Sequence, residues 1–153
     1  MKISTKGRYA VRAMIELATH SKDQPMPLSQ ISERQGISLN YLEQLFVRLR
    51  RAGVVKSVRG PGGGYFIAKD PEKISIKDVL LAAEENMHIV DCLKYDDNGF
   101  CDQYKFDECV TRMIWKKLGD QILKAMGDIS IQDLCKEKAK IKNRLKQDCI
   151  VKS

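Results

Sequence analysis

The chain has 153 residues, of which 43% are hydrophobic, and a formal net charge of +7 at pH 7. This length fits one small domain with an appended element, and the lack of an apolar run of about 18 residues excludes a membrane span. The N-terminal segment has no apolar signal-peptide core, so we expect a cytoplasmic protein. The five cysteines are an odd number, which argues against a disulfide framework.

The positive charge is concentrated in the first half of the chain. Residues 1–80 contain fourteen Lys and Arg against seven Asp and Glu, whereas residues 81–153 contain thirteen of each kind. The whole excess therefore lies in the first half. This distribution is typical of a module that binds a polyanion, followed by a part that is close to neutral.

Residues 1–83 predict a winged helix-turn-helix, a mainly α-helical fold with a small β-hairpin. Hydrophobic spacing indicates three helices, at residues 4–20, 28–35 and 38–53. Gly36 separates the second helix from the third by a short break, as in a helix-turn-helix whose second helix reads the DNA. Two strands follow, at residues 54–58 and 65–67, and a glycine-rich tip joins them as a hairpin.

The exposed face of the reading helix is rich in amide and guanidinium groups, which suit base edges and phosphates in a DNA major groove. The glycine-rich tip carries Arg59 and can bring this cation close to a duplex. A solvated helix with an ordinary hairpin is the alternative, but a basic hairpin directly after the helix favours DNA binding. The candidate DNA-binding residues are Ser38, Asn40, Tyr41, Glu43, Gln44, Arg48, Arg59, Gly62 and Gly63.

The second half begins with a predicted helix at residues 75–86, which leads into an acidic, cysteine-bearing loop at residues 84–109. Residues 107–134 predict a long helix and a short helical cap. The apolar face of this helix is broader than one small domain needs, so we expect it to pair with a second chain in a homodimer. Packing onto its own winged helix is the alternative. Residues 135–153 are lysine-rich, which indicates a solvated helix or a basic flexible tail.

Three cysteines lie in the acidic segment, with eight residues between Cys92 and Cys101 and seven between Cys101 and Cys109. Zinc sites have paired cysteines about two to four residues apart and four ligands, so this spacing does not indicate a zinc ribbon. Three thiolates with a fourth ligand from elsewhere suit an iron–sulfur cluster, which prefers soft sulfur ligands. A redox-sensing set of thiols and purely structural cysteines are the alternatives.

Three segments carry a resemblance to a known family, at residues 1–18, 31–46 and 57–71. They resemble the IscR family of winged-helix regulators, which also includes the nitric-oxide sensor NsrR and the cysteine-metabolism regulator CymR. The match is dense over residues 1–83 and resumes at the cysteines and at residues 109–118. The resemblance implies a homodimeric transcription regulator, not an enzyme, that binds a double-stranded DNA operator and controls cluster-biogenesis genes.

The resemblance also implies a [2Fe–2S] cluster on Cys92, Cys101 and Cys109, with a cluster-assembly scaffold protein as a further partner. Such regulators take a fourth ligand from a histidine three residues after the last cysteine, or from a carboxylate near the start of the first helix. Here these positions are Arg112 and Arg8. Arginine stays protonated and cannot ligate a metal, so neither familiar fourth ligand is present.

Glu43 is our hypothesis for the fourth ligand. A carboxylate on the reading helix is poorly placed against phosphate and in a duplex could accept a hydrogen bond only from a cytosine amino group. If Glu43 of either chain held the cluster, loss of the cluster would free the reading helix directly. A nitric-oxide or redox sensor of the same family is the alternative function, followed by an iron–sulfur carrier that does not bind DNA. The other candidate ligands are His88, Asp102, Asp107, Glu108 and Cys135.

Overall fold

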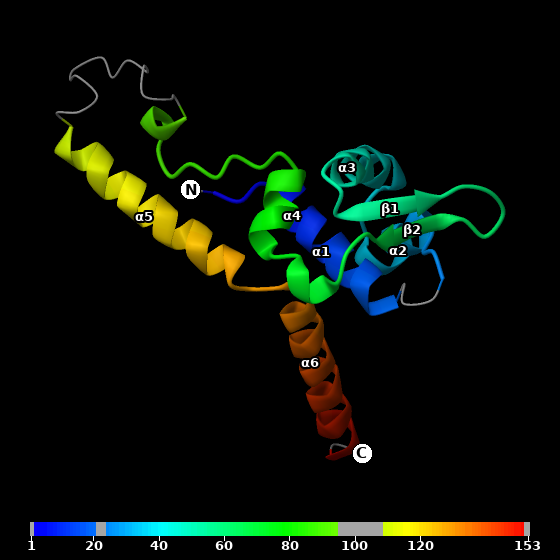
Figure 1. Ribbon diagram of the computed structural model, residues 1–153. Helices are drawn as coiled ribbons and strands as arrows, with labels where there is room; N and C mark the ends of the chain where they lie inside the picture. Colours follow the sequence, from blue (N-terminus) through cyan, green and yellow to red (C-terminus); the bar gives the residue numbers. More distant parts are fainter. Residues whose placement is uncertain (1, 21–23, 95–108, 152–153) are drawn as a thin grey trace.

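The computed structural model describes residues 2–20, 24–94 and 109–151, with side chains up to residue 147. In this part of the chain, α1–α4 and a two-stranded antiparallel hairpin form one body, from which α5 and α6 extend in different directions (Figure 1). None of the described helices is long and apolar enough to cross a membrane. The elements are α1 (Thr5–His20), α2 (Leu28–Gln35), α3 (Leu39–Arg51), β1 (Val55–Val58), β2 (Gly64–Ile67), η1 (Pro71–Lys73), α4 (Ile76–Ala82), η2 (Asp91–Leu93), α5 (Val110–Gly127) and α6 (Ile131–Val151).

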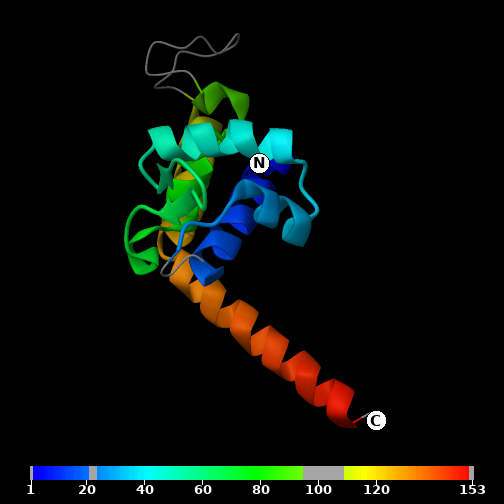
Figure 2. The same ribbon diagram turned by 90° about the vertical axis from the view of Figure 1, so that its right-hand side faces the viewer.

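The predicted apolar stripes of α1 and α3 are buried in one hydrophobic core. Helix α3 lies across the body in the view of Figure 2, and its buried side faces the core. Because one face of α3 is occupied in this way, its opposite face must point outward. The buried residues of the two stripes are Ala10, Ala13, Met14, Leu17, Leu42, Leu45, Phe46 and Leu49.

Helix α3 begins and ends as the sequence predicts. Ser38 is its N-cap, and the Ser38 Oγ accepts a hydrogen bond of 3.3 Å from the Tyr41 amide. This bond satisfies one of the N–H groups that the first turn of a helix leaves without a partner. The chain leaves the helix at Gly53, whose φ of 71° is left-handed and is adopted freely only by glycine.

A tight turn joins β1 and β2 at the tip of the hairpin. The Gly63 amide donates to the Gly60 carbonyl at 2.9 Å, and Gly62 has a φ of 73°. Pro61 precedes Gly62, so the four residues have the arrangement typical of a type II turn, which requires a left-handed residue in its third position. The predicted hairpin is therefore confirmed.

The hairpin is attached to the body on two sides. Tyr65 of β2 exchanges two backbone hydrogen bonds with Met26, of 3.0 and 2.9 Å. Gly64 permits this approach, since a Cβ at this position would lie 2.5 Å from the Met26 backbone. The Tyr65 ring also contacts the Phe46 ring of α3 edge to face, with centroids 4.8 Å apart. These contacts hold the hairpin beside α3.

Helices α4 and α6 begin with the same motif, Ile-Ser-Ile-x-Asp, at residues 74–78 and 129–133. In both motifs, the serine and aspartate side chains exchange hydrogen bonds with the backbone of the first turn. The motifs also pair with each other, because the Ile76 amide donates to the Ile129 carbonyl at 2.9 Å and the Ile131 amide donates to the Ile74 carbonyl at 2.8 Å. This reciprocal pairing fixes the start of α6 against the body.

The described part of the predicted basic tail is helical, and no break separates it from the predicted cap after residue 134. The predicted cap and tail are one helix, α6, which is described to Val151. The cause is tertiary packing, since Ile131 is fully buried and Lys138 Nζ donates to the Glu16 carboxylate of α1 at 2.7 Å. Residues 139–147 are exposed, so the solvated-helix alternative describes this part of α6.

Helix α4 ends at Ala82, earlier than the predicted residue 86. Glu84 stops it with a φ of 56°, the one left-handed non-glycine φ among the described residues. The amides of Glu84 and Glu85 donate to the carbonyls of Leu81 and Leu80, at 2.9 and 3.0 Å, as in a Schellman motif. A left-handed backbone costs a non-glycine residue about 1–2 kcal/mol. The sequence gives no sign of this stop, because glycine is the usual residue there.

Glu16 joins three helices through a buried carboxylate, whose side chain is 4% exposed. It pairs with Arg34 of α2 at 3.3 Å, with Lys138 of α6 at 2.7 Å and with His20 of α1 at 3.1 Å. Burial raises the pKa of Glu16, but the hydrogen bond and charge of Lys138, the hydrogen bond of Arg34 and the charge of His20 together outweigh burial. The pKa of Glu16 therefore lies below its ordinary value.

We expect Glu16→Gln to lower the free energy of unfolding at pH 7 by about 1–2 kcal/mol, because Lys138 and Arg34 lose their charged partner. The charged carboxylate stabilises the fold fully above its ordinary pKa of 4.5 and loses this effect as the pH falls through the lower native value. Urea unfolding should show the difference between wild type and variant shrinking from about pH 6 to about pH 3. A difference that stays constant over this range would contradict the assignment.

Candidate nucleic-acid interface and cysteine segment

The outward face of α3 carries the predicted polar groups. Asn40, Glu43 and Gln44 are exposed on the side opposite the buried stripe. Amide side chains in this position can read adenine edges in a major groove. Val47 lies among them and is 36% exposed, although it was missing from the predicted set. Its position directly after the buried Phe46 could have placed it on this face, where an aliphatic side chain suits a thymine methyl group.

Ser38 and Tyr41, at the start of α3, already have partners within the chain. The Ser38 side chain caps the helix, and the half-buried Tyr41 ring contacts the Tyr9 ring of α1 edge to face, with centroids 5.6 Å apart. These contacts position the first turn of α3. A direct contact between DNA and either residue stays a prediction.

Three arginines lie in the last turns of α3. Arg48 Nε is 3.2 Å from Glu84 Oε2, at the end of α4. Arg50 Nη1 donates to Ser57 Oγ of β1 at 3.3 Å, and Arg51 is exposed. Sequence reasoning missed Arg50, although basic residues in the last turn of a helix favour an anion-binding surface and also suit the helix dipole.

The hairpin extends beyond the body beside α3 (Figure 1). Arg59 is exposed near its tip, and Lys56 of β1, a cation missing from the predicted set, lies 5.8 Å from the centre of the Phe66 ring. Gly63 has a structural role, since a Cβ there would lie 2.4 Å from the Val58 carbonyl oxygen. Gly62 supplies the left-handed residue of the turn. The two glycines therefore shape the tip that presents Arg59.

The structure describes two of the three predicted cluster cysteines. Cys92 is in η2, Cys109 directly precedes α5, and both are half-buried free thiols. Cys101 lies outside the described residues. The two elements belong to one end of the molecule, because η2 contacts α5 and lies beside it in Figure 1.

Cys109 has surroundings that favour the thiolate. Its Sγ lies 3.2 Å from Thr111 Oγ1. The hydrogen bond with Thr111 and the backbone amide of Arg112 lower the pKa of the Cys109 thiol. A thiolate is the form that binds metals, so this donor fits the soft ligand set of an iron–sulfur cluster. No group of three or more metal-binding side chains gathers among the residues that the structure describes, a set that lacks Cys101.

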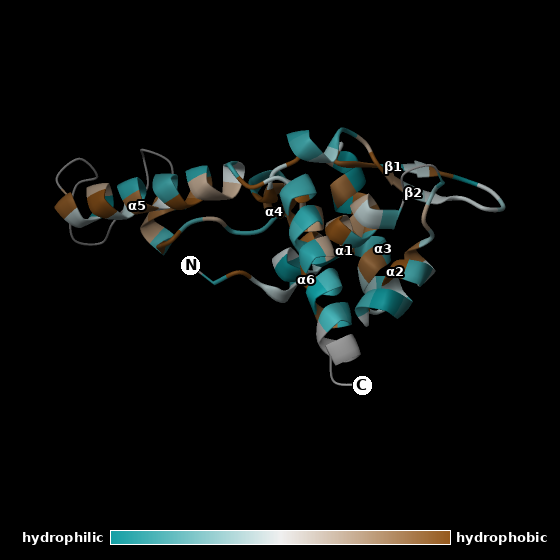
Figure 3. Cartoon of the chain, turned by 90° about the horizontal axis from the view of Figure 1, so that it is seen from below, coloured by the Kyte–Doolittle hydropathy of each residue, from teal (hydrophilic) through white to brown (hydrophobic). Residues whose placement is uncertain are grey.

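Arginines stand at the two positions from which related regulators take the fourth cluster ligand. Arg8 is exposed near the start of α1 and donates to Thr5 Oγ1 at 3.2 Å. Arg112 is in the first turn of α5. Glu43 is exposed on α3, and within one chain α3 and the first turns of α5 lie on opposite sides of α4 (Figures 1 and 3). A contact between Glu43 and the cysteines would therefore need the α3 of a second copy.

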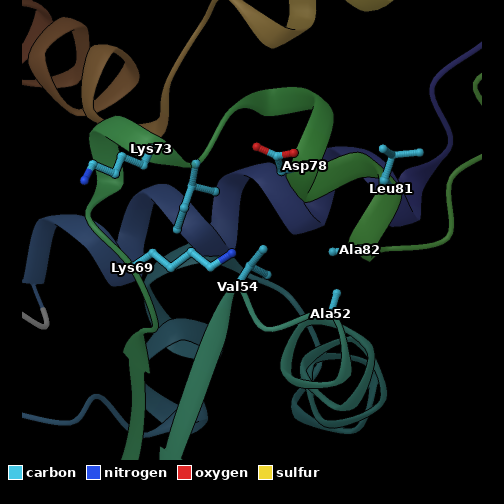
Figure 4. A pocket seen from close by; sticks show the side chains of 8 residues that line it. Ala52, Val54, Lys69, Lys73, Asp78, Leu81 and Ala82 are labelled. Atoms are coloured by element: carbon cyan, nitrogen blue, oxygen red, sulfur yellow. The ribbon is translucent and has the colours of Figure 1, made fainter.

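A shallow hollow lies between the end of α3, β1 and α4, away from the outward face of α3 (Figure 4). Two lysines and one aspartate are its charged lining residues, and the described lining includes no cysteine or histidine. Its chemistry therefore differs from that of a thiolate metal site. The lining residues are Ala52, Val54, Lys69, Lys73, Ile74, Asp78, Leu81 and Ala82.

Helix α5 has an apolar face that its own chain leaves exposed (Figure 3). No residue of α5 is buried, although Ile122, Leu123 and Met126 in its second half are half-buried. Helix α5 contacts α4, but packing onto its own winged helix does not cover the first half of the helix. The exposed residues there are Val110 (68%), Met113 (68%), Ile114 (51%), Trp115 (39%) and Leu118 (45%).

Comparison with known proteins decides the family. The model of the Rrf2 family, described as an iron-dependent transcriptional regulator, matches residues 3–137. The chain belongs to the Rrf2 family. The match spans the winged helix, the cysteine segment and α5, so both halves of the chain are typical of Rrf2 proteins.

Individual relatives agree with this assignment. The HTH-type transcriptional regulator IscR of Xenorhabdus nematophila is 46% identical over 136 residues, which are 89% of this chain and 80% of the relative. IscR of Vibrio campbellii is 45% identical over 148 residues, which are 97% of this chain and 85% of the relative.

Solved structures of Rrf2-type regulators share the fold. T. potens IscR has a TM-score of 0.71 at 38% identity and covers 90% of this chain and 88% of its own. CymR, the global cysteine regulator of B. subtilis, has a TM-score of 0.73 at 33% identity and covers 90% of this chain and 98% of its own. The predicted winged-helix fold is confirmed, and this Rrf2 protein is a DNA-binding transcriptional regulator rather than an enzyme.

We expect Arg59→Ala to weaken duplex binding about 3–10-fold at moderate salt and to reduce the slope of log affinity against log salt by about 0.9, because one phosphate contact is lost. Fluorescence anisotropy with a labelled duplex at several salt concentrations measures both quantities. The matched control is Lys140→Ala, which removes the same charge from an exposed position on α6. An affinity that Arg59→Ala leaves unchanged at every salt concentration would contradict a contact by the hairpin.

Proposed function

We propose that this Rrf2 protein is a homodimeric regulator that senses iron–sulfur cluster status through a [2Fe–2S] cluster and controls cluster-biogenesis genes. The observation that carries the proposal is the placement of Cys109, a thiol with a lowered pKa at the start of the helix that extends from the DNA-binding body. The similarity to relatives named IscR supports it. Such a regulator acts on DNA in the cytoplasm.

Cys92, Cys101 and Cys109 would hold the cluster as thiolates. When bound, the cluster supplies an iron centre whose presence depends on the cellular supply of clusters. The described residues contribute a hydrogen bond between Thr111 Oγ1 and Cys109 Sγ and a free thiol at Cys92. A cluster-assembly scaffold protein is the partner that would deliver a cluster to these thiols.

Glu43 of a partner chain is our proposal for the fourth ligand. Arg112 and Arg8 occupy the usual positions, and neither side chain can ligate a metal. The exposed Glu43 carboxylate is an oxygen donor on the outward face of α3. This assignment would place one side chain at both the DNA-reading surface and the cluster.

The homodimer would form through the exposed apolar face of α5. Large exposed apolar patches rimmed by polar residues mark protein–protein contacts, and symmetric dimers bury the same patch on both chains. A dimer of winged helices would bind a near-palindromic operator with half-sites about 34–36 Å apart, or a multiple of that distance.

Anaerobic reconstitution of purified protein with iron and sulfide tests the cluster. We expect the wild type to show visible absorption and about two iron atoms per chain, and Cys92→Ala and Cys109→Ala to lose most of both, because each variant lacks a thiolate ligand. The matched control is Cys135→Ala, a half-buried free thiol on α6, which should keep the wild-type spectrum. A wild type without iron, or cysteine variants that retain the full spectrum, would contradict the proposed cofactor.

The same reconstitution tests the fourth ligand separately. Glu43→Ala should shift the visible spectrum and shorten the lifetime of the cluster in air, because an iron atom loses a protein donor. An unchanged spectrum and lifetime would overturn the assignment of Glu43 and would leave the three cysteines in place.

We expect Met113→Glu to convert the dimer to a monomer in light scattering coupled to size-exclusion chromatography, because it places a charge within the apolar face. Lys116→Glu is the matched control, since Lys116 is exposed on the same helix and outside the apolar face. This variant should stay dimeric. A wild type with the mass of one chain would contradict the homodimer.

A further inference from the structure

Glu84 lies where the winged-helix body ends and the segment that leads to the cysteines begins. Its carboxylate reaches back to α3, with Oε2 at 3.2 Å from Arg48 Nε. The Glu84 side chain is 64% exposed and that of Arg48 is 35% exposed, so the ion pair lies at the surface, along one edge of α3. One of the candidate DNA-binding arginines is thus engaged by a carboxylate of its own chain.

The surrounding structure holds Glu84 in this place. Its carbonyl accepts a hydrogen bond of 2.6 Å from Lys6 Nζ of α1. The neighbouring Glu85 is buried, and its carboxylate accepts from the Ser4 amide at 3.0 Å and from the Gly7 amide at 3.1 Å. Gly7 permits this approach, since a Cβ there would lie 2.8 Å from Glu85 Oε2. The backbone at residues 84–85 is therefore anchored to the start of α1.

The backbone conformation of Glu84 points to a role for its side chain. Its φ of 56° is in the left-handed region, where glycine is the usual residue. A glycine would form the same helix stop without strain, but it would remove the carboxylate that pairs with Arg48. Strained positions of this kind are a reason to look for function at the side chain concerned.

The pairing limits what Arg48 can do. A guanidinium group binds a phosphate by directed hydrogen bonds of the kind that it makes with a carboxylate. Arg48 follows Gln44 of the outward face by one helical turn, so the two side chains are neighbours on the helix surface. A phosphate that binds Arg48 Nε therefore competes with the Glu84 carboxylate for the same donor.

We propose that Glu84 is a positioning residue that competes with DNA phosphate for Arg48, so that its carboxylate lowers the affinity of the protein for DNA. This role rests on the DNA-binding function of α3 and deepens it, because it names an acidic residue that sets the affinity. Glu84 also begins the segment that carries Cys92. A change in the backbone conformation of that segment would move the Glu84 carboxylate and so alter its ion pair with Arg48.

A double-mutant cycle tests this role with a labelled duplex that the wild-type protein has recovered from a random-sequence pool. The proteins compared are the wild type, Glu84→Gln, Arg48→Gln and the double variant. Glutamine keeps the length and the left-handed backbone of Glu84 and removes only its charge. We expect Glu84→Gln to tighten binding about 3–5-fold at low salt, because Arg48 is released from a surface ion pair, and to have little effect when Arg48 is already glutamine.

Glu72→Gln is the matched control for the loss of one negative charge. Glu72 is also 64% exposed and also pairs with a cation, Lys136, at 3.8 Å, but it lies on η1 and pairs with α6 rather than α3. It should change the affinity clearly less than Glu84→Gln. If Glu84→Gln tightens binding equally with and without Arg48, or no more than Glu72→Gln does, the positioning role of Glu84 is overturned.

Glu84→Gly separates positioning from stability. It removes the carboxylate and relieves the left-handed backbone, so the variant should unfold at a higher temperature and still bind the duplex more tightly than the wild type. Tighter binding that is absent from Glu84→Gly would overturn the role. If the wild type recovers no duplex, DNA binding itself fails. If it recovers one that Glu84→Gln binds with unchanged affinity, only the role of Glu84 fails.

Discussion

Burial of one face of α3 in the common hydrophobic core determines where the other DNA-reading groups point. Leu42, Phe46 and Leu49 are fully buried, so the opposite side of the helix must face outward, with its amides and its carboxylate in solvent. Phe46 also contacts Tyr65 of the hairpin, which fixes the hairpin beside α3. A single core therefore sets both parts of the nucleic-acid interface.

The paired Ile-Ser-Ile-x-Asp motifs determine where the rest of the chain goes. Their hydrogen bonds hold the start of α6 beside the start of α4. The part of the chain between the two motifs therefore begins and ends at the same place on the body. Helix α5 belongs to this part of the chain and exposes its apolar face. The described cysteines, Cys92 and Cys109, are thereby separated from α3. Glu84 lies at the start of the segment that leads to them, and its ion pair with Arg48 connects this segment to α3.

Sequence patterns predicted the winged helix well because its elements depend on local signals. The helical spacing of Leu42 and Phe46, the cap at Ser38 and the glycine-rich tip each specify structure within a few residues. The end of α4 was not predicted, because Glu84 occupies the left-handed position after the helix, where glycine is the usual residue and the usual sequence signal. The continuity of α6 across residue 134 was not expected, because it depends on Ile131 and Lys138, whose partners lie far away in sequence. The contact of Glu84 with Arg48 was not predictable from local patterns for the same reason.

We propose that the cysteine segment and the DNA-reading surface of this Rrf2 protein act on each other. The most direct test compares the duplex affinity of anaerobically reconstituted protein with that of the same protein after a chelator has removed its iron. Coupled sites typically change each other's affinity about 5–150-fold, so the two affinities should differ by at least about fivefold. Equal affinities, for a protein that demonstrably gained and lost its iron, would contradict this coupling.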